Sequence, residues 1–428
     1  MKIAIIGTGI SGLTAAYHLN PHCELSLFEA NSYIGGHTAT IDVNWQGDTA
    51  AVDTGFIVFN DRTYPNFIKM MDDLQVDYQK TTMSFSVKNQ VSGLEYRGAD
   101  LNGFFAQRQN LFRPRIYRII RGLIRFNKIA LSMNADESSK MTIREFFDCH
   151  KFSKTFVEDY FLPMGSAIWS CPGETFLDFP IRFVIEFYSN HGLLSVNDRP
   201  QWYVIKGGSR SYIPKLTSEF ADRIQLNTPV EQVLRHPEFV SVKTKNGTEQ
   251  FDQVIFACHS DQALRILGDD VELTEREILS SFPYEKNQVI LHTDSKVMPK
   301  QKRAWACWNY SIDPANDQRA TVTYYMNQLQ SLANKTDFFV TLNQPGDISR
   351  ESVIAEFEYH HPVFEANRYL AQRRHQELIL NNRTSFCGAY WGNGFHEDGV
   401  ASGLRVAERI KSELEFSEAT PLKQEAVR

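Results

Sequence analysis

The first 36 residues constrain the fold of this chain more than any other stretch of its sequence. Residues 3–6 form a short, β-branched apolar run, and the glycine-rich segment from Gly7 to Gly12 follows it directly. Residues 13–19 then place apolar side chains at helical spacing, and residues 25–28 form a second apolar run. Such runs are typical of buried parallel strands separated by a helix. The segment therefore predicts a strand, a helix and a second, parallel strand.

The three glycines of the turn have different chemical roles. Gly7 permits a tight turn out of the strand, Gly9 carries no side chain that would hold a pyrophosphate away, and Gly12 lets the helix pack closely on the strand. A pyrophosphate would then lie on the free N–H groups at the start of the helix, near Ile10 and Ser11. The turn therefore predicts a dinucleotide-binding site.

The residues after the second strand indicate which dinucleotide is expected. Glu29, seventeen residues after Gly12, is placed to accept the ribose hydroxyls. Ala30 follows it, and a second glycine pair, Gly35 and Gly36, comes a few residues later, before His37. NAD does not require such a pair.

Here the sequence resembles the amine-oxidase-like FAD-dependent oxidoreductase superfamily, in which this glycine pair wraps the FAD pyrophosphate. The resemblance implies FAD, contacted by Ala30, Gly35, Gly36 and His37, although Arg usually occupies the position of His37. No Cys or His stands at an obvious flavin-attachment position, so we expect non-covalent FAD.

Three more segments carry the same resemblance. Residues 52–59 match a segment that runs beside the flavin, which implies contacts from Thr54, Gly55 and Phe56; the alternative is an ordinary strand with a glycine bend. Val230 matches a residue whose backbone meets the adenine. Near the C-terminus, a strand end, a loop and a helix resemble the superfamily's closing motif, which places four residues at the flavin: Gly388, Phe395, His396 and Gly399.

Two side chains of the closing motif are candidates for a catalytic base. His396 and Glu397 are the titratable residues nearest, in sequence, to the expected flavin edge. The alternative is a structural role for both, because the family uses the backbone of this loop.

Composition excludes several other classes of protein. The net charge of −6 gives no general attraction to nucleic acid, and no apolar run reaches the length of a membrane span. The six cysteines are scattered without a C-x-x-C pair, so we expect neither a metal site nor a disulfide framework. The chain begins with its first strand and shows no signal peptide, so we expect a cytoplasmic protein.

Together these signals predict an α/β fold, with a Rossmann-type FAD-binding domain and a discontinuous α+β substrate domain. We expect the FAD-binding domain to comprise residues 1–75, 200–265 and 380–415, and the substrate domain residues 76–199 and 266–379. Residues 416–428 are polar and are expected to form a loose tail.

A basic segment stands out within the expected substrate domain. Residues 101–134 hold seven Arg and Lys residues and no acidic residue, and the stretch from Arg115 to Lys128 has the spacing of an amphipathic helix. Such a helix can lie on anionic lipid, which would make the protein peripheral on the inner membrane. The alternative is a solvated helix that covers the substrate domain.

The substrate domain is rich in Phe, Tyr and Trp, which suits the lining of a cavity for a lipophilic substrate; the alternative is a plain aromatic core. Residues 167–170, 190–194 and 396–399 resemble a subgroup of bacterial predicted NAD/FAD-binding proteins, often encoded beside methyltransferases that act on lipids. That resemblance implies fatty-acyl chemistry and a lipid methyltransferase as a pathway partner.

Many amine oxidases of the superfamily place Lys near the flavin, where this chain has Asn287 beside Lys286. We therefore predict a dehydrogenase or desaturase of a fatty-acyl-type substrate. The alternatives are a carotenoid-type desaturase or isomerase, an amine oxidase, and an FAD-binding scaffold without turnover.

Overall fold

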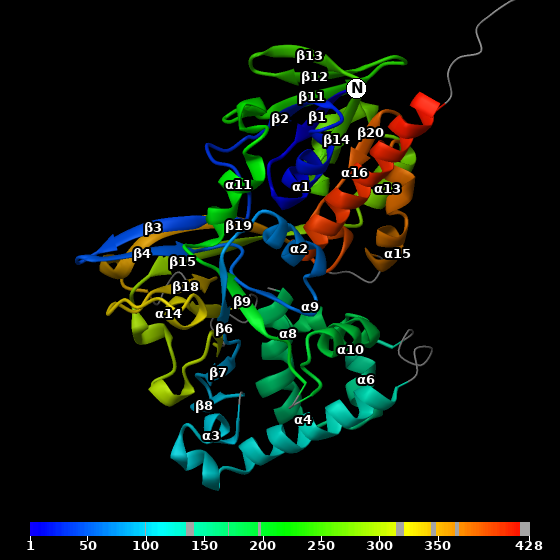
Figure 1. The fold of residues 1–428 in the computed structure, drawn as a ribbon. Helices are drawn as coiled ribbons and strands as arrows, with labels where there is room; N and C mark the ends of the chain where they lie inside the picture. The colour runs from blue at the N-terminus through cyan, green and yellow to red at the C-terminus, as the bar shows by residue number, and fades with distance from the viewer. Residues whose placement is uncertain are drawn as a thin grey trace, which may run out of the picture.

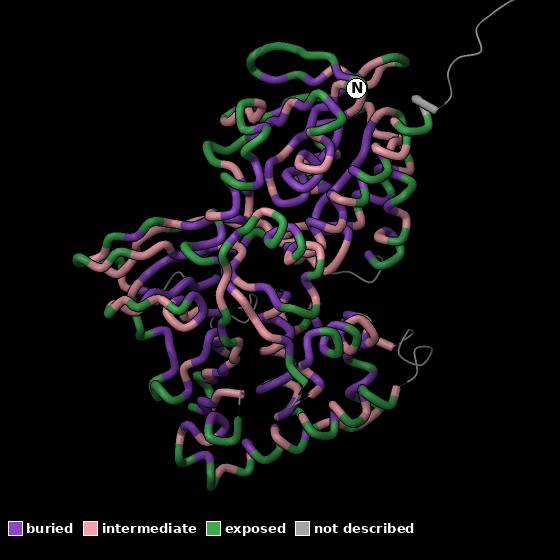
Figure 2. The backbone as a smooth tube through the Cα atoms, viewed as in Figure 1, coloured by how far each residue is buried: buried purple, intermediate pink, exposed green. Residues whose placement is uncertain are grey.

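The computed structural model describes residues 1–98, 100–133, 141–169, 171–195, 198–313, 321–343, 348–363 and 368–419. Figure 1 shows two parts of the molecule: one is built around a parallel sheet and includes both ends of the described chain, and the other is built around a larger mixed sheet with helices beside it. We call them the parallel-sheet half and the mixed-sheet half. Figure 2 shows that buried residues run through both.

The parallel-sheet half has five strands in the order β10-β2-β1-β14-β20, all parallel. They are β10 (Ile224–Gln225), β2 (Glu24–Phe28), β1 (Lys2–Ile6), β14 (Gln253–Phe256) and β20 (Thr384–Phe386). Helix α1 (Ile10–Leu19) connects β1 to β2, and α16 (His396–Ala419) packs along α1. The expected Rossmann-type α/β fold is confirmed, with strands that come from three distant parts of the chain.

Smaller elements surround this sheet. A three-stranded antiparallel sheet contains β11 (Val230–Arg235), β12 (Val240–Thr244) and β13 (Gly247–Phe251). Helices α11 (Ile213–Thr217), α12 (Ser260–Leu267), α13 (Leu273–Leu279) and α15 (Arg368–Arg373) also belong to this half. Helix α16 reaches Ala419 and so extends past residue 416, where we expected a loose tail; residues 420–428 lie outside the described ranges.

The mixed-sheet half has seven strands in the order β19-β15-β18-β17-β16-β7-β8. They are β19 (Val353–Pro362), β15 (Tyr284–His292), β18 (Phe339–Leu342), β17 (Val322–Tyr325), β16 (Trp308–Ile312), β7 (Phe85–Asn89) and β8 (Leu94–Arg97). Only the β16–β7 pair is parallel. The sheet therefore joins strands from residues 85–97 with strands from residues 284–362.

Two small sheets link the halves. Strands β3 (Thr40–Trp45) and β4 (Asp48–Asp53) form a hairpin, and its Val43 and Val52 share a core with Val289 and Leu291 of the mixed sheet. Strands β5 (Phe59–Asn60), β9 (Trp202–Ile205) and β6 (Tyr78–Thr81) form the other, and α2 (Pro65–Asp73) follows β5. Residues 40–53 therefore leave the parallel-sheet half, although they precede the expected boundary at residue 75.

Helices form the rest of the mixed-sheet half. They are α3 (Leu101–Phe104), α4 (Pro114–Ser132), α6 (Ile143–Cys149), α7 (Lys154–Phe156), α8 (Leu162–Trp169), α9 (Gly173–Leu177), α10 (Ile181–Asn190) and α14 (Met326–Leu329). The core under α4 is mostly aromatic, with Phe126 in ring contact with Phe146, Phe161 and Tyr188. Within the described ranges, no helix combines the length and apolarity that a membrane span needs.

Candidate active site

The turn between β1 and α1 is shaped by close backbone contacts. A Cβ on Gly12 would lie 2.1 Å from the carbonyl oxygen of Gly7, so only glycine lets α1 approach the strand this closely. Helix α1 begins at Ile10, and its N-cap Gly9 offers no side chain to the first N–H groups. A Cβ on Gly9 would meet no atom within 4 Å, so there is open space in front of these N–H groups. This arrangement suits a phosphate group.

Glu29 is buried at the end of β2, beside this turn. Its carboxylate accepts hydrogen bonds from the backbone N–H of Thr8 at 3.0 Å, the Thr8 hydroxyl at 2.6 Å and the N–H of Asn31 at 2.9 Å. A carboxylate has about four acceptor positions, so one remains for a ribose hydroxyl. Ala30, the next residue, is exposed.

The second glycine loop crosses the first. Gly35 forms a bridge with Gly9, and its N–H donates to the carbonyl of Thr8 at 3.0 Å. The segment 54–56 runs alongside, because the N–H of Phe56 donates to the carbonyl of His37 at 2.7 Å. A Cβ on Gly55 would lie 2.1 Å from that same carbonyl oxygen. The predicted contact residues from three segments therefore lie together.

Three histidine rings meet beside these loops. The ring of His37 lies 6.3 Å from that of His259 and 5.8 Å from that of His361, measured between centroids. Nε2 of His37 and Nδ1 of His361 are buried and have no hydrogen-bond partner among the described residues. Burial, with neighbouring histidines, lowers the pKa of His259 and of His361 to about 3.

Buried polar atoms are normally paired, so the two unpaired nitrogens indicate a missing polar group. An anionic pyrophosphate beside Gly9 would supply it. The residues present therefore fit FAD: the start of α1 and His37 would hold the pyrophosphate, and Glu29 the ribose. The sequence pointed to His37 but not to His361, which lies on β19 more than 300 residues away.

The closing motif approaches the same turn from the C-terminal side. A Cβ on Gly399 would lie 2.6 Å from the Ile10 side chain, so α16 packs tightly on α1. Gly388 follows β20, and its N–H donates to the Ser402 hydroxyl at 2.9 Å. Val230, predicted near the adenine, is buried at the start of β11.

His396 is buried at the start of α16. Its ring stacks on Phe56 with centroids 3.7 Å apart, and its Nε2 hydrogen-bonds the Tyr212 hydroxyl at 2.8 Å. Burial lowers the pKa of His396 to about 3, which makes it neutral at pH 7 and a weak base. Its assignment as a catalytic base stays a prediction.

The Glu397 carboxylate is hydrogen-bonded to the first residues of α2. Its two carboxylate oxygens accept hydrogen bonds from the N–H groups of Asn66 at 3.1 Å and Phe67 at 2.9 Å, and from the Asn66 side-chain amide at 2.7 Å. Burial raises the pKa of Glu397. These contacts give it a helix-capping role, and its catalytic assignment is likewise still a prediction.

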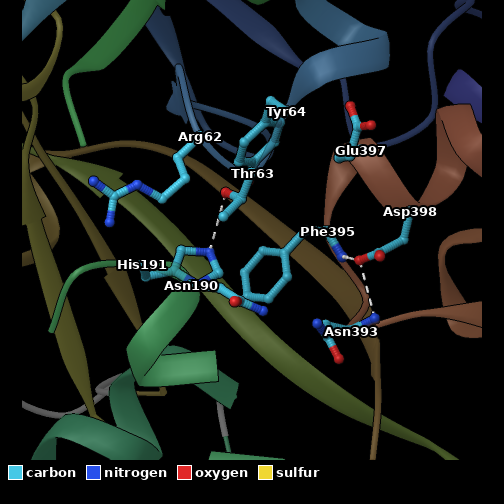
Figure 3. A pocket seen from close by; sticks show the side chains of 9 residues that line it. All are labelled: Arg62, Thr63, Tyr64, Asn190, His191, Asn393, Phe395, Glu397 and Asp398. Carbon is cyan, nitrogen blue, oxygen red and sulfur yellow. Dashed lines mark hydrogen bonds between the residues drawn. The ribbon is translucent and has the colours of Figure 1, made fainter. Parts of the chain in front are cut away.

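A pocket of about 280 Å³ opens beside the closing motif (Figure 3). Its lining comes from the segment before α2, the end of α10 and the start of α16: Arg62, Thr63, Tyr64, Asn190, His191, Asn393, Phe395, Glu397 and Asp398. Figure 3 shows the Phe395 ring between His191 and Asn393. Arg62 had no signal in the sequence, because it belongs to no recognisable motif, and His191 lay within residues 190–194, whose resemblance to a subgroup gave it no role.

The wall of this pocket is aromatic on one side and polar on the other. His191 stacks on Phe187 at 3.8 Å between centroids, and Phe395 lies 5.4 Å from the same ring. The Asp398 carboxylate accepts the N–H groups of Asn393 at 3.0 Å and Phe395 at 2.9 Å. Burial raises the pKa of Asp398 to about 6.

Two further expectations concern the mixed sheet. Asn287 is buried in β15 and hydrogen-bonds Asn343, whereas Lys286 is mostly exposed and pairs with Glu358 at 3.1 Å. The structure therefore places Asn287 inside the mixed sheet and Lys286 at its surface. Among the described residues, no group of three His, Cys, Asp or Glu side chains is arranged to hold a metal ion.

Comparison with known proteins settles the family. The model of the family described as "Flavin containing amine oxidoreductase" matches residues 10–327, well over half of the chain. The chain belongs to this family. It is therefore an FAD-dependent oxidoreductase, as the two glycine loops and Glu29 indicated. No curated protein matches the chain in a sequence search.

Solved structures show the same fold at low sequence identity. Cyclohexylamine oxidase from Brevibacterium oxydans is 15% identical with a TM-score of 0.67, over 97% of this chain and 99% of that one. Putrescine oxidase bound to putrescine is 14% identical with a TM-score of 0.66, over 96% and 99%. A fatty acid isomerase from P. acnes is 15% identical with a TM-score of 0.66, over 95% and 98%. At these identities the matches establish the fold of the FAD-dependent oxidoreductase, not its substrate.

Proposed function

We propose that this FAD-dependent oxidoreductase holds its FAD non-covalently and acts as a dehydrogenase or desaturase of a lipophilic, fatty-acyl-type substrate. The observation that carries the proposal is the charge arrangement of the pocket. Its two carboxylates, Glu397 and Asp398, already accept hydrogen bonds from N–H groups. Its cation, Arg62, pairs at 2.7 Å with Asp198, which is 78% exposed.

An ion pair with so exposed a partner is weak. Arg62 is therefore able to exchange Asp198 for the carboxylate of a substrate, with which a guanidinium forms strong, directional hydrogen bonds. The rings of His191 and Phe395, which line the pocket and pack on Phe187, would contact the adjoining hydrocarbon. Such a site suits an acid with an apolar chain.

The pocket suits an amine less well. An ammonium group is held by a free carboxylate or between aromatic faces. Both pocket carboxylates are engaged by the backbone, and Phe395 turns one face to Phe187. Amine oxidation is nevertheless the second candidate, because two of the structural neighbours are named as amine oxidases.

Bound FAD would supply the acceptor for a hydride. The chain itself supplies position and electrostatics. The aromatic wall and Arg62 would orient the substrate, and the N–H groups at the start of α16 present the positive end of a long helix to this region. His396 and Glu397 remain the predicted candidates for the base that takes the second proton.

The test is an anaerobic absorbance spectrum of the purified yellow protein, recorded with an unsaturated fatty acid, a polyene and a simple amine. We expect the fatty acid to bleach the flavin band and the amine to leave it unchanged. Rapid bleaching by benzylamine or a polyamine, without bleaching by fatty acid, would replace this proposal with amine oxidation. Acid precipitation should release the flavin into the supernatant, and a yellow pellet would contradict non-covalent binding.

Arg62→Gln provides a sharper test of the carboxylate contact. We expect weaker fatty-acid binding with an unchanged FAD content, because Arg62 lines the pocket and not the glycine loops. Arg144→Gln is the matched control, since Arg144 forms an exposed ion pair on α6. Equal fatty-acid affinity in both variants would remove Arg62 from the substrate site.

A further inference from the structure

Helix α4 and the turn before it present an exposed face of unusual composition. Four large apolar side chains of this stretch are exposed: Phe112 (88%) before the helix, and Tyr117 (48%), Ile124 (65%) and Leu131 (68%) on it. Tyr117, Ile124 and Leu131 are spaced by seven residues, so they form one stripe along the helix. The opposite side of α4 is buried through Ile116, Ile119 and Phe126. An exposed apolar stripe of this length marks an interaction surface.

The cations of the helix divide into two groups. Arg115 pairs with the buried Asp159, and Arg125 donates to the carbonyls of His150 and Lys151 while its guanidinium covers Phe152. Those two cations hold α4 to the rest of the fold.

The other group consists of Arg118, Arg121 and Lys128. Each is exposed, and within the described part of the chain none makes a hydrogen bond or an ion pair. By helical spacing, Arg121 and Lys128 lie directly beside the apolar stripe and Arg118 further round the same side. The stripe is therefore bordered by cations that do not hold the helix to the rest of the fold.

We propose that this face of α4 docks on an anionic lipid surface. The apolar stripe would enter the boundary between headgroups and acyl chains, and the three free cations would meet lipid phosphates, as in helices that lie in the membrane interface. A stripe bordered only by positive charge favours this occupant over a protein surface of mixed charge. Helix α4 lies at the end of the molecule remote from the parallel sheet, so docking leaves the glycine loops accessible (Figure 1).

The proposal rests on α4 alone and does not depend on the substrate of the enzyme. Its test is co-sedimentation of the full-length, FAD-loaded protein with vesicles of phosphatidylcholine alone and of phosphatidylcholine mixed with phosphatidylglycerol. We expect binding to the mixed vesicles that decreases at high salt, and little binding to the neutral ones. Equal binding to both, or to neither, overturns the proposal.

Two variants of α4 separate its charge from its apolar stripe. Removing all three cations in Arg118→Gln, Arg121→Gln and Lys128→Gln should weaken binding about 100-fold, at about fivefold for each cation. Ile124→Ser with Leu131→Ser should also weaken binding and leave folding intact, because both side chains are already exposed.

The matched control is Lys69→Gln, Lys206→Gln and Lys245→Gln, which removes three exposed cations outside α4. The control should bind as wild type does. A loss equal to that of the α4 triple variant would mean that net charge alone drives binding, which overturns the assignment to α4. The proposal would also be overturned if the wild-type protein bound no vesicles but associated with itself, and if only the α4 variants abolished that self-association. The face would then be assigned to a second copy of the chain.

Discussion

The two halves of the molecule are held together by different means. In the parallel-sheet half, backbone lies against backbone, as in Gly12 on Gly7 and Gly55 on His37. In the mixed-sheet half, large rings lie against each other, and Phe126 alone touches several of them. A cofactor with fixed phosphates needs backbone N–H groups at fixed places, whereas a substrate cavity is shaped by side chains. The two halves should therefore respond differently to substitution.

Substitution of the two neighbouring glycines should have the largest effect and should separate fold from cofactor. Gly12→Val should destabilise the protein by more than about 4 kcal/mol, because its side chain overlaps the Gly7 carbonyl and the Ala257 side chain. Gly9→Val should fold normally and lose its flavin, because the new side chain has room but fills the space in front of α1. Soluble yield, thermal unfolding and the flavin-to-protein absorbance ratio measure both outcomes. Full flavin in Gly9→Val would show that this turn is not the phosphate site.

A change in the aromatic core should give the reverse pattern. Phe126→Ala leaves a cavity where a fully buried ring made several ring contacts, and should lower the free energy of unfolding by about 3–5 kcal/mol. The folded fraction should still bind FAD, because no residue of the glycine loops touches Phe126. Denaturant unfolding and flavin content are the measurements. Loss of FAD from protein that remains folded would show that the halves are coupled.

Glu29→Ala should have a smaller effect, seen mainly in the affinity for the cofactor. Loss of a charge-assisted hydrogen bond to a ribose hydroxyl should weaken FAD binding by about 1.5–3 kcal/mol, or one to two decades in Kd. The variant also frees the Thr8 and Asn31 N–H groups, so Glu29→Gln should retain part of the affinity. Flavin-fluorescence titration of apoprotein gives Kd, with Glu24→Ala on the exposed face of the same strand as control. Unchanged FAD affinity would mean that Glu29 stabilises only the loop around Thr8 and Asn31 and does not contact the ribose.

The smallest effect concerns acid stability of the mixed-sheet half. His292 is buried, its Nδ1 accepts the N–H of Asp294 at 3.1 Å, and burial lowers its pKa to about 4. In the unfolded chain the pKa is about 6.5, so below pH 6.5 the unfolded state binds more protons and stability falls. Between pH 7 and pH 5, protonation linked to this histidine should lower the free energy of unfolding by about 1–2 kcal/mol.

His292→Gln should flatten that pH dependence, whereas His22→Gln at an exposed position should not. In the parallel-sheet half, some buried groups lower the free energy of unfolding as the pH falls and others raise it. His396 behaves like His292, but burial raises the pKa of Asp398 to about 6, so protonating it as the pH falls below 6 restores stability. Denaturant unfolding at both pH values measures the difference. If the free energy of unfolding changed equally with pH in wild type and in His292→Gln, His292 would not be the source of the acid sensitivity.

Local sequence was sufficient to predict the parallel-sheet half and its cofactor site. The unit from residue 1 to Glu29 is contiguous, and Gly12 meets Gly7 only five residues before it, although both glycines also meet Ala257 after β14. The same holds for the start of α16, where a loop and a helix follow a short strand in one continuous segment. The fold class and the cofactor could therefore be predicted from short-range patterns.

Only the tertiary structure decided the rest. His361 reaches His37 because β19 pairs with β15 at the edge of the mixed sheet, and Arg62 reaches His191 because β5 pairs with β9. Glu397 resembled a candidate base in the sequence, yet the fold places it on the start of α2. The basic helix was visible in the sequence, but which of its cations are free depends on the neighbours Asp159 and residues 150–152. A motif records contacts made by neighbouring residues, whereas side chains from distant segments acquire their roles only when strands pair and helices pack.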